Sequence, residues 1–395
     1  MSKTVLLGVT GSIAAYKTAE LASSLKKMGY NVHVLMTENA TNFINPITFE
    51  TLTGNKCLVD TFDRNFEFSV EHVSVAKQAD VCLIAPASAN VIGKLANGIA
   101  DDMLTTTVMA CKCKVIIAPA MNTNMYTNPI VQDNIEKLTR FGYEVIQPDT
   151  GYLACGDTGI GKMPSPDELL WYILRETACD KDLSGKKVLV TAGPTMEKID
   201  PVRYITNHST GKMGYSIAKM CMLRGADVTL VSGKTNEKPP KFVNVIDIVS
   251  AKDMFDAVTS NFDTADIVIK AAAVADYRPK NPSDEKVKKK DGELQIELER
   301  TDDILKYLGD HKTHQFLCGF SMETENMLEN SKAKLAKKNL DMIVANNLKQ
   351  SGAGFGTDTN VVTIITSDTV KELPLMSKDE AANQIIDCIL EKMAL

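Results

Sequence analysis

The chain opens with Val5-Leu-Leu-Gly-Val-Thr-Gly-Ser-Ile-Ala-Ala-Tyr16, and a stretch of the same kind, Val188-Leu-Val-Thr-Ala-Gly-Pro-Thr195, follows much later. Each is an apolar run that leads into a glycine-containing loop, as a strand does before a helix. Two such beginnings predict two α/β domains, residues 1–179 and 188–395, joined by a short charged linker at 180–187. Each domain can hold a phosphate-bearing ligand where its first helix begins.

The composition limits what the chain can be. Its 395 residues suit two or three domains at roughly 150 residues each. A net charge of -6 argues against nonspecific binding of nucleic acid, which needs a basic surface. No apolar run approaches the ~20 residues of a membrane span, and the N-terminus has no signal-peptide pattern. We therefore expect a cytoplasmic protein with no nucleic-acid or membrane partner.

The nine cysteines are scattered along the chain. The closest pair, Cys111 and Cys113, has no histidine near it, so its spacing does not suit a zinc site. An odd number of cysteines does not suit a framework of disulfides. We expect reduced thiols, most of them in the core, with Cys155 as the exception.

The first half alternates short apolar runs with helical stretches such as residues 13–28; the runs are 5–9, 32–36, 81–85, 115–118 and 144–146. This alternation predicts a doubly wound, Rossmann-like parallel sheet with helices on both faces. Ligands bind such sheets beyond the carboxyl ends of the strands. The residues at those ends are small or carry hydroxyl or amide groups; they include Gly11, Ser12, Thr37, Ser88, Asn90 and Asn122.

The first loop is not a G-x-G-x-x-G fingerprint, because Gly11 is followed by Ser12. A dinucleotide needs close backbone approach at more than one glycine. A mononucleotide phosphate on the helix N-terminus, held by Ser12 and backbone amides, fits better. A serine that caps the helix and binds no ligand is the alternative.

Three residues outside the strands carry a sharper signal. His72 lies at the start of a helix, where a surface residue or a cap is the ordinary interpretation. Asn122 lies in a turn and has the same alternative. Cys155 lies in residues 154–163, which contain three glycines and no apolar period, so we expect a mobile loop and an accessible thiol.

On these residues the first half resembles the flavin-containing cysteine decarboxylase family. The matching motifs are Gly11-Ser-Ile-Ala-Ala-Tyr-Lys17, His72, Pro86-Ala-Ser-Ala-Asn90, Pro119-Ala-Met-Asn-Thr-Asn-Met125 and Ala154-Cys-Gly-Asp157. Tyr126 stands where some members have Trp. The resemblance implies FMN at a subunit interface, usually in trimers, with Gly11, Ser12, Ile13, Thr37, Ser88 and Asn90 as FMN-binding residues.

The chemistry of that family explains the residue types. Loss of CO2 from a cysteine carboxylate leaves a carbanion with no electron sink, and oxidation of the thiol by a flavin creates one. A proton donor must then quench the carbon. By resemblance Cys155 is that donor, His72 assists the oxidative step, and Asn122 holds the substrate carboxylate.

The second half repeats the pattern, with apolar runs at 188–191, 228–232, 267–273, 316–320 and 342–345 and helices at 215–223 and 325–338. It predicts a second Rossmann-like domain. Residues 286–298 alternate about Asp291-Gly292, which predicts a β-hairpin arm.

Several groups in this half suit a nucleoside triphosphate. The loop 211–214 contains two glycines and enters a helix, but it is not a Walker motif. Lys286 and Lys288–Lys290 form a basic cluster, and Lys334 and Lys338 share one helix face. Solvent-exposed charge is the ordinary alternative for both. Asp276 follows a buried strand, where it can serve a ribose, a base or a metal.

This half resembles the phosphopantothenate–cysteine ligase family, through Gly193-Pro-Thr195, Asp200-Pro-Val-Arg203, Asn207-His-Ser-Thr-Gly-Lys-Met-Gly214, Ala273-Val-Ala-Asp-Tyr-Arg278, Glu285-Lys286 and Gly319-Phe320. The resemblance implies CTP as co-substrate with Mg²⁺, whose ligands stay unknown. Asn207 and Lys286 match active-site positions. The residues that match nucleotide-binding positions are Asp276, Lys286, Asp302, Asp303, Ile304, Leu305, Phe320, Lys334 and Lys338. Thr301-Asp302-Asp303 stands where many relatives have Asn-Pro-Asp.

Together the two resemblances imply a bifunctional enzyme of coenzyme A biosynthesis. The ligase half joins cysteine to 4'-phosphopantothenate, and the decarboxylase half acts on the product, 4'-phosphopantothenoylcysteine. Trimeric first halves and dimeric second halves would be compatible with a dodecamer. The alternatives are a non-catalytic, flavin-binding regulatory subunit and a pyridine-nucleotide oxidoreductase. The missing dinucleotide fingerprint disfavours the second.

Overall fold

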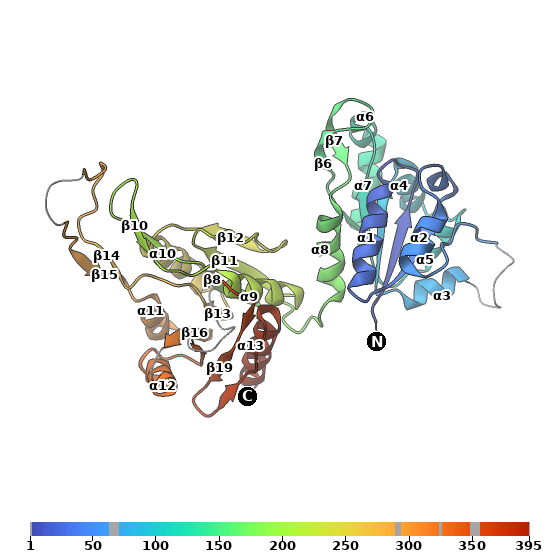
Figure 1. The fold of residues 1–395 in the computed structure, drawn as a ribbon. Coiled ribbons are helices and arrows are strands. Elements are labelled where there is room, and N and C mark those ends of the chain that lie inside the picture. The colour runs from blue at the N-terminus through green and yellow to red at the C-terminus, as the bar shows by residue number, and fades with distance from the viewer. Residues whose placement is uncertain (1, 63–70, 289–293, 324–325, 348–355, 395) are drawn as a thin grey trace. The chain divides into compact units, whose positions relative to one another are not determined.

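The computed structural model describes residues 2–62, 71–288, 294–323, 326–347 and 356–394. The chain divides into two compact units, Met1–Cys179 and Asp180–Leu395, each with its own sheet (Figure 1). No helix among the described residues is both long enough and apolar enough to cross a bilayer.

The first unit contains a parallel sheet of five strands in the order β2-β1-β3-β4-β5. The strands are β1 (Thr4–Val9), β2 (Asn31–Met36), β3 (Val81–Ala87), β4 (Lys114–Pro119) and β5 (Glu144–Val145). The strand order reverses between β1 and β3, and the loops at the carboxyl ends there form the usual ligand site of a doubly wound sheet. The predicted parallel sheet is confirmed.

Helices cover both faces of this sheet, which explains why its strands are apolar runs without alternation. Leu7 faces a cluster with Leu21, Phe49 and Leu169, whereas its neighbour Leu6 faces the opposite cluster. The first face is covered by α1 (Ala15–Lys27), α2 (Pro46–Thr53) and α8 (Pro166–Thr177). The second is covered by α3 (Glu71–Gln78), α4 (Ala89–Ala96), α5 (Met103–Ala110) and α7 (Pro129–Arg140). The described part of the unit also contains two short helices, η1 (Glu38–Asn42) and α6 (Thr123–Tyr126).

A hairpin follows the last strand of this sheet and carries Cys155. Its strands, β6 (Asp149–Tyr152) and β7 (Thr158–Lys162), pair antiparallel. The sequence predicted a loop over residues 154–163, and that prediction was wrong for 158–162. The glycines there serve close packing, because a Cβ on Gly161 would overlap the carbonyl oxygen of Met121.

The second unit contains an eight-stranded sheet among the described residues, in the order β12-β11-β8-β13-β16-β17-β19-β20. Six strands are parallel: β8 (Lys187–Ala192), β11 (Asp227–Ser232), β12 (Asn244–Asp247), β13 (Ile267–Lys270), β16 (Phe316–Glu323) and β17 (Met342–Asn347). The edge strands β19 (Val362–Ile365) and β20 (Val370–Glu372) are antiparallel. The mostly parallel, doubly wound sheet is therefore confirmed here too.

In the described part of this unit, helices pack on both faces of the sheet. An apolar cluster on one face joins Leu189 and Val268 to α10 (Ala251–Phe262), α11 (Ile304–His311) and α12 (Met327–Lys337). On the other face, α9 (Lys212–Leu223) contacts β8 and packs against α13 (Lys378–Met393). The helix α9 begins three residues earlier than predicted, so Gly214 lies in its first turn. A Cβ there would lie 2.6 Å from that of Ala192, so glycine allows the helix to approach the strand.

The arm of the second unit differs in its pairing from the predicted hairpin. β14 (Tyr277–Pro279) pairs antiparallel with β15 (Leu298–Arg300), and residues 286–288 belong to no strand. The predicted turn at Asp291-Gly292 lies outside the described residues. Two further short pairs are β9 (Met196–Lys198) with β10 (Tyr204–Thr206) and β18 (Thr359–Asn360) with β21 (Met376–Ser377).

The segment predicted as a linker packs on the second unit. Leu183 is fully buried. The buried Arg224 pairs with Asp182 of this segment at 2.5 Å and with Asp387 of α13 at 2.6 Å. These ion pairs fix where the second unit begins.

Candidate active sites

The carboxyl edge of the first sheet is held together by Thr10. Its buried hydroxyl donates to the carbonyl oxygen of Pro86 at 2.8 Å and accepts from the amide of Ser88 at 2.9 Å. The loop after β1 therefore stays beside the Pro86–Asn90 motif. Ser12 lies in that loop, but α1 begins only at Ala15, and the serine hydroxyl accepts from the amide of Ala14 at 3.3 Å. Ser12 is thus not the formal cap of α1.

Asn122 and Cys155 meet, although 33 positions separate them in the chain. The Nδ2 atom of Asn122 lies 3.3 Å from the Cys155 Sγ atom and 3.5 Å from Asp157 Oδ2. The thiol donates to the same carboxylate oxygen at 3.4 Å. Asn122 also caps α6 by accepting from the amide of Asn124, so its side chain has a fixed direction. Cys155 is the exposed thiol among nine free cysteines, as predicted.

Close packing fixes the hairpin that carries Cys155. The amide of Met121 donates to the carbonyl oxygen of Gly161 at 3.0 Å. A Cβ on Gly159 would overlap the Thr123 hydroxyl, and Gly161 has a φ of +136°, a backbone conformation that favours glycine. These two glycines let β7 lie against the segment that contains Asn122, and so bring the two side chains together.

A pocket of about 460 Å³ opens in front of these side chains, and we call it the Cys155 pocket. It is lined by residues of the first loop, of the Asn122 segment and of the hairpin, including Ser12, Ile13, Lys17, Asn122, Tyr152, Cys155 and Lys162. Burial, together with the positive charge of Lys162, lowers the pKa of Lys17. Ile13, Tyr16 and Tyr152, which line this pocket, are 56%, 62% and 71% exposed, so three large side chains are open to solvent there.

Other residues predicted for the first site lie outside this pocket. Thr37 is buried at the end of β2, Ser88 caps α4, and Asn90 is exposed on that helix. His72 lies on α3 and is half-buried. In Figure 1, α3 lies away from the β6–β7 hairpin within the first unit. One copy of the chain therefore places Asn122 and Cys155 together, and it does not place His72 with them.

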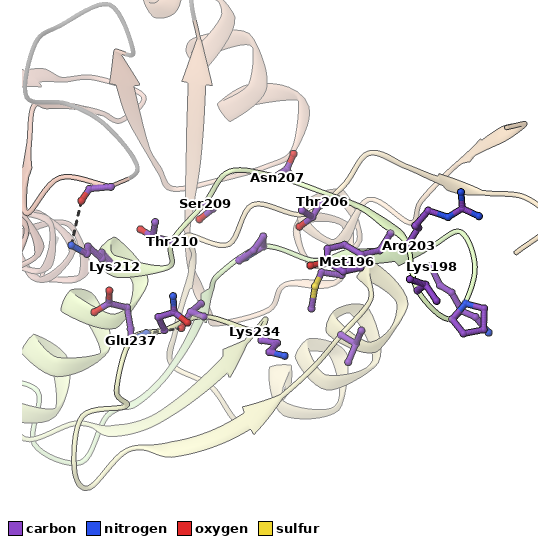
Figure 2. A pocket seen from close by; sticks show the side chains of 18 of the residues that line it. Met196, Lys198, Arg203, Thr206, Asn207, Ser209, Thr210, Lys212, Lys234 and Glu237 are labelled. Atoms are coloured by element: carbon purple, nitrogen blue, oxygen red, sulfur yellow. Dashed lines mark hydrogen bonds between the residues drawn. The ribbon is translucent and has the colours of Figure 1, made fainter. Parts of the chain in front are cut away.

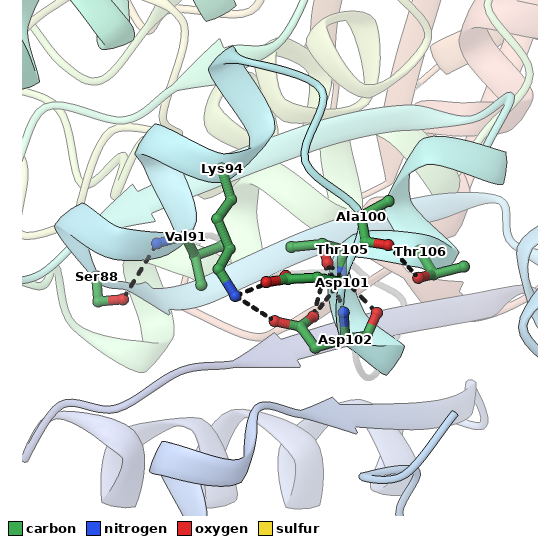
Figure 3. A network of polar contacts seen from close by, with 8 residues as sticks. All are labelled: Ser88, Val91, Lys94, Ala100, Asp101, Asp102, Thr105 and Thr106. Carbon is green, nitrogen blue, oxygen red and sulfur yellow. Dashed lines mark hydrogen bonds and ion pairs between the residues drawn. The ribbon is translucent and has the colours of Figure 1, made fainter. Parts of the chain in front are cut away.

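An ion-pair network fixes the helix that follows the Pro86–Asn90 motif. Lys94 on α4 pairs with Asp101 at 2.7 Å and with Asp102 at 3.1 Å (Figure 3). Asp102 also caps α5 and bonds Thr105 in a capping box. Burial would raise the pKa of Asp102, but hydrogen bonds from Thr105 and Lys94 hold it below its ordinary value. The network holds α4 to the start of α5.

In the second unit, eight of the nine predicted nucleotide-binding residues line one pocket of about 420 Å³, which we call the Lys334 pocket. These are Asp276, Asp302, Asp303, Ile304, Leu305, Phe320, Lys334 and Lys338. Asp303 caps α11 and pairs with Lys338 at 2.9 Å. Lys334 donates to the carbonyl oxygen of Phe320 at 3.0 Å. The pocket combines three carboxylates with several amines, a mixture that suits a sugar phosphate.

Asn207 lines a larger pocket, of about 800 Å³, which we call the Asn207 pocket. Figure 2 shows its cationic side chains, Lys198, Arg203, Lys212 and Lys234. Asn207 itself donates to the carbonyl oxygen of Ala273 at 3.0 Å, just after β13. A small cavity around the start of α9 shares Ser209 and Thr210 with this pocket and Ala272 and Phe320 with the Lys334 pocket. The three cavities therefore adjoin along the carboxyl edge of the sheet.

Lys286 is exposed and does not line the Lys334 pocket. Its neighbour Val287 is held by two residues of the Asn207 pocket: the Val287 amide donates to Asp200 Oδ2 at 3.1 Å, and the Val287 carbonyl accepts from Arg203 at 2.8 Å. Asp200 and Arg203 also form an ion pair at 2.5 Å. The hydrogen bond from Arg203 holds the pKa of Asp200 well below its ordinary range. This buried carboxylate fixes the segment beside Lys286.

Two family models together match nearly the whole chain. Residues 1–178 match the family described as Flavoprotein, and residues 183–393 match the DNA/pantothenate metabolism flavoprotein C-terminal domain. The coenzyme A biosynthesis bifunctional protein CoaBC of Bacillus subtilis (strain 168) is 49% identical over 391 residues, 98% of this chain and 96% of that protein. The chain belongs to the family of bifunctional coenzyme A biosynthesis proteins.

As a member of this family, the chain is an enzyme with a flavoprotein decarboxylase half and a ligase half, and this prediction is confirmed. A cysteine/cysteine sulfinic acid decarboxylase from an unknown prokaryotic organism is 44% identical and covers 88% of this chain and 99% of that protein. A crystal structure of the C-terminal domain of a CoaBC protein is 47% identical and covers 54% of this chain and 98% of that chain, with a TM-score of 0.47.

Sequence reasoning missed Lys270, which lines the Lys334 pocket. It lies inside the apolar run 267–273 and was counted as part of that predicted strand; in the structure it is the last residue of β13. Asp157 was noted only as part of a motif, yet it contacts both Asn122 and Cys155. Its spacing of two from the cysteine, across a glycine, was the available signal.

Proposed function

We propose that the second unit joins cysteine to 4'-phosphopantothenate through an acyl-cytidylate made from CTP, with release of pyrophosphate. The first unit then decarboxylates 4'-phosphopantothenoylcysteine to 4'-phosphopantetheine. The observation that carries the proposal is the 3.3 Å contact between Asn122 and Cys155, because it unites a carboxylate-binding amide with a proton-donating thiol. The product of one reaction is the substrate of the other, which accounts for the fusion.

In the ligase reaction, the Lys334 pocket takes the nucleotide and the adjoining Asn207 pocket takes 4'-phosphopantothenate. The cations of the Asn207 pocket suit the phosphate of that substrate. Asn207 lies next to the cavity that joins the two pockets, where the carboxylate and the nucleotide would meet. Lys286, on the segment held by Asp200 and Arg203, would offset negative charge as pyrophosphate leaves.

Magnesium would enter with the nucleotide. Among the described residues, no cluster of three histidine, cysteine or carboxylate side chains is arranged to hold a metal ion. Mg²⁺ commonly keeps several waters and binds one or two carboxylates plus substrate phosphates. The carboxylates of the Lys334 pocket are compatible with that mode.

The residues of the first unit fit FMN. Gly11 lets the first loop approach η1 closely, since a Cβ there would lie 3.0 Å from that of Asn39. Ser12 and the start of α1 offer donors for a phosphate, and Thr37, Ser88 and Asn90 offer polar contacts at the same edge of the sheet. When bound, FMN supplies a reversible electron acceptor for the substrate thiol. The chain's own residues place the carboxylate at Asn122 and deliver a proton from Cys155 Sγ.

A complete decarboxylase site requires another copy of the chain. His72 is on α3, outside the Cys155 pocket. The exposed residues Ile13, Tyr16 and Tyr152 offer a surface on which the first unit of another copy of the chain can pack. We infer a homo-oligomer, trimeric through its first units, in which one copy supplies His72 and another supplies Cys155. Mixing a His72→Asn variant with a Cys155→Ser variant should restore part of the activity that each lacks. No recovery after co-refolding would contradict a shared site.

The reaction itself gives the test. Full-length protein purified under native conditions should show flavin absorbance. With 4'-phosphopantothenate, cysteine and Mg²⁺, it should release CO2 and pyrophosphate when CTP is added, and less when ATP replaces CTP. A colourless protein, or one that releases neither product with any nucleotide, would contradict the proposal.

A second candidate comes from the relative named as a cysteine/cysteine sulfinic acid decarboxylase. That activity needs the same Asn122–Cys155 pair but no ligase product. An assay with free cysteine or cysteine sulfinic acid, without 4'-phosphopantothenate or nucleotide, distinguishes the two candidate functions. Release of CO2 from either amino acid alone would favour the second candidate.

A further inference from the structure

Lys270 occupies a core position of the second sheet. It lies at the carboxyl end of β13, between Thr191 of β8 and Gly319 of β16. Side chains two apart on a strand share a face, and Val268 lies in the apolar cluster under α10, α11 and α12. Lys270 therefore continues an apolar face, where lysine is rare unless it has a partner.

The ammonium of Lys270 has a sulfur atom as its hydrogen-bond partner. The residue is 7% exposed, and its Nζ atom lies 3.7 Å from the Sδ atom of Met254 on α10. Among the described residues no oxygen lies within hydrogen-bond distance of it. A buried charge without a partner is costly. Methionine would fill the same place without that cost, so packing alone does not explain a lysine here.

The side chain reaches the wall of the Lys334 pocket, where two further lysines converge. Lys334 donates to the carbonyl oxygen of Phe320, and Lys338 pairs with Asp303. Both of these lysines therefore already have oxygen partners in the protein. Lys270 lines the same pocket, and its hydrogen-bond partner within the described part of the chain is a sulfur atom. A ligand that brings anionic oxygens into this pocket would supply what Lys270 lacks.

We propose that Lys270 is a nucleotide-binding residue whose Nζ atom donates to a phosphate oxygen of the nucleotide in the Lys334 pocket. The inference rests on the proposed assignment of that pocket to the nucleotide. It adds a buried cation to the two lysines that the sequence already indicated. A phosphate oxygen fits better than a base edge, because the three amines meet at one place and their charges add.

Protonation of Lys270 is then coupled to binding. Burial lowers its pKa to about 7; Asp303 at the start of α11 opposes this shift, and Lys338 and Lys334 on α12 add to it. The residue that faces it from α10, Met254, is uncharged. A bound phosphate favours the charged amine, so nucleotide binding at pH 8 takes up a proton, and affinity falls as the pH rises above 7.

Without nucleotide, the same shift acts on stability. Between pH 7 and the ordinary lysine pKa of 10.5, the unfolded chain binds a proton at this position that the folded chain lacks. The stability contribution of Lys270 therefore improves as the pH rises through that window. A Lys270→Met variant should lose this dependence and melt at a higher temperature near pH 7.

The test is calorimetric titration of the full-length protein with Mg²⁺-CTP and with cytidine. Measurements at pH 8 in two buffers of different ionisation enthalpy give the protons taken up. Wild type should bind CTP with proton uptake, and Lys270→Met should bind CTP about tenfold or more weakly, without uptake, as expected for a lost charge-assisted hydrogen bond. Cytidine affinity should be unchanged. Lys392→Met, on α13 and paired with Asp368, is the control and should match wild type.

Equal CTP affinity and equal proton uptake in wild type and Lys270→Met would overturn this inference alone. Absence of proton uptake in wild type would overturn it without any variant. If wild type bound no CTP, the assignment of the pocket and this inference would both be overturned. A drop in affinity for CTP and cytidine alike would also contradict it, since a phosphate contact cannot weaken cytidine binding.

Discussion

The two sites differ in where their binding residues and their reacting residues lie. In the second unit, eight of nine predicted nucleotide-binding residues line one pocket at the carboxyl edge of the sheet, and Lys286 alone lies outside it. In the first unit, Asn122 follows a sheet strand, but Cys155 lies on a hairpin that leaves the sheet. The comparison indicates that the proposed binding residues gather at the edge of the sheet, whereas the proposed reacting residues Cys155 and Lys286 lie on segments outside the sheet.

Specific contacts hold the segment with Cys155 and the segment with Lys286 in place. The hairpin with Cys155 is held by close packing of Gly159 and Gly161 against residues 121–123. The segment with Lys286 is held by a buried charge, Asp200, together with Arg203. We call the contacts of Gly159 and Gly161 the steric fastening and those of Asp200 and Arg203 the electrostatic fastening. Different substitutions should disrupt each.

The largest effect should come from the thiol. Cys155→Ser removes the proposed proton donor and should lower decarboxylation by roughly a hundred- to ten-thousandfold, the range of general acid catalysis. Ligation should stay unchanged, because the hairpin belongs to the other unit. CO2 and pyrophosphate release measure the two activities separately. Cys113→Ser, a half-buried thiol elsewhere in the first unit, is the control; equal loss of both activities in Cys155→Ser would contradict separate sites.

The next effect concerns Lys286. Lys286→Gln removes the positive charge that we propose offsets the leaving pyrophosphate, and it should slow ligation by about a hundredfold, while decarboxylation of supplied 4'-phosphopantothenoylcysteine continues. Lys288→Gln changes a neighbouring exposed lysine and should have little effect. If both variants behaved alike, the charge at 286 would have no special role.

The steric fastening is tested by Gly161→Ala. The added Cβ would overlap the carbonyl oxygen of Met121, and the positive φ disfavours alanine, so the hairpin must shift. Decarboxylation should fall by about tenfold, since a misplacement near 1 Å is costly in catalysis. Gly151→Ala, whose Cβ would have only ordinary contact with Lys162, is the matched control. Full activity in Gly161→Ala would mean that the packing does not position Cys155.

The electrostatic fastening should give the smallest effect, on stability. The depressed pKa of Asp200 means that its contribution is present above the ordinary aspartate pKa of about 3.9 and is lost as the pH falls below it. Asp200→Asn should therefore melt at a lower temperature than wild type at pH 7, and the gap should narrow in acid. Thermal unfolding at pH 7 and pH 3.5 checks this. If the difference in melting temperature between wild type and Asp200→Asn did not change with pH, the charge of Asp200 would not be the source of its stabilising effect.

Sequence reasoning placed the sheets well because buried parallel strands are continuous apolar runs. The runs at 5–9, 81–85 and 188–191 all became strands. It failed where glycine serves packing and not flexibility, as at Gly159 and Gly161. It also paired the arm of the second unit wrongly, because β14 and β15 are separated by a stretch whose local alternation suggested a nearer partner.

For the candidate sites, too, sequence reasoning succeeded near the sheet strands and failed for contacts that have no local sequence pattern. Asp276 follows β13 and Phe320 lies in β16, and both line one pocket because these two strands are neighbours in the sheet. Lys270 was missed because burial of a lysine has no local signature. The contact of Asp200 with Val287 spans 87 positions, and no spacing rule predicts it.

The central claim is that the two sites act in succession on one substrate. Cysteine labelled in its carboxylate carbon tests it most directly, with wild-type enzyme, 4'-phosphopantothenate and Mg²⁺-CTP. Labelled CO2 should appear only when all components are present, and it should equal the pyrophosphate released once the reaction is complete. Labelled CO2 released from cysteine without CTP, or pyrophosphate formed with no CO2 following it, would contradict the claim.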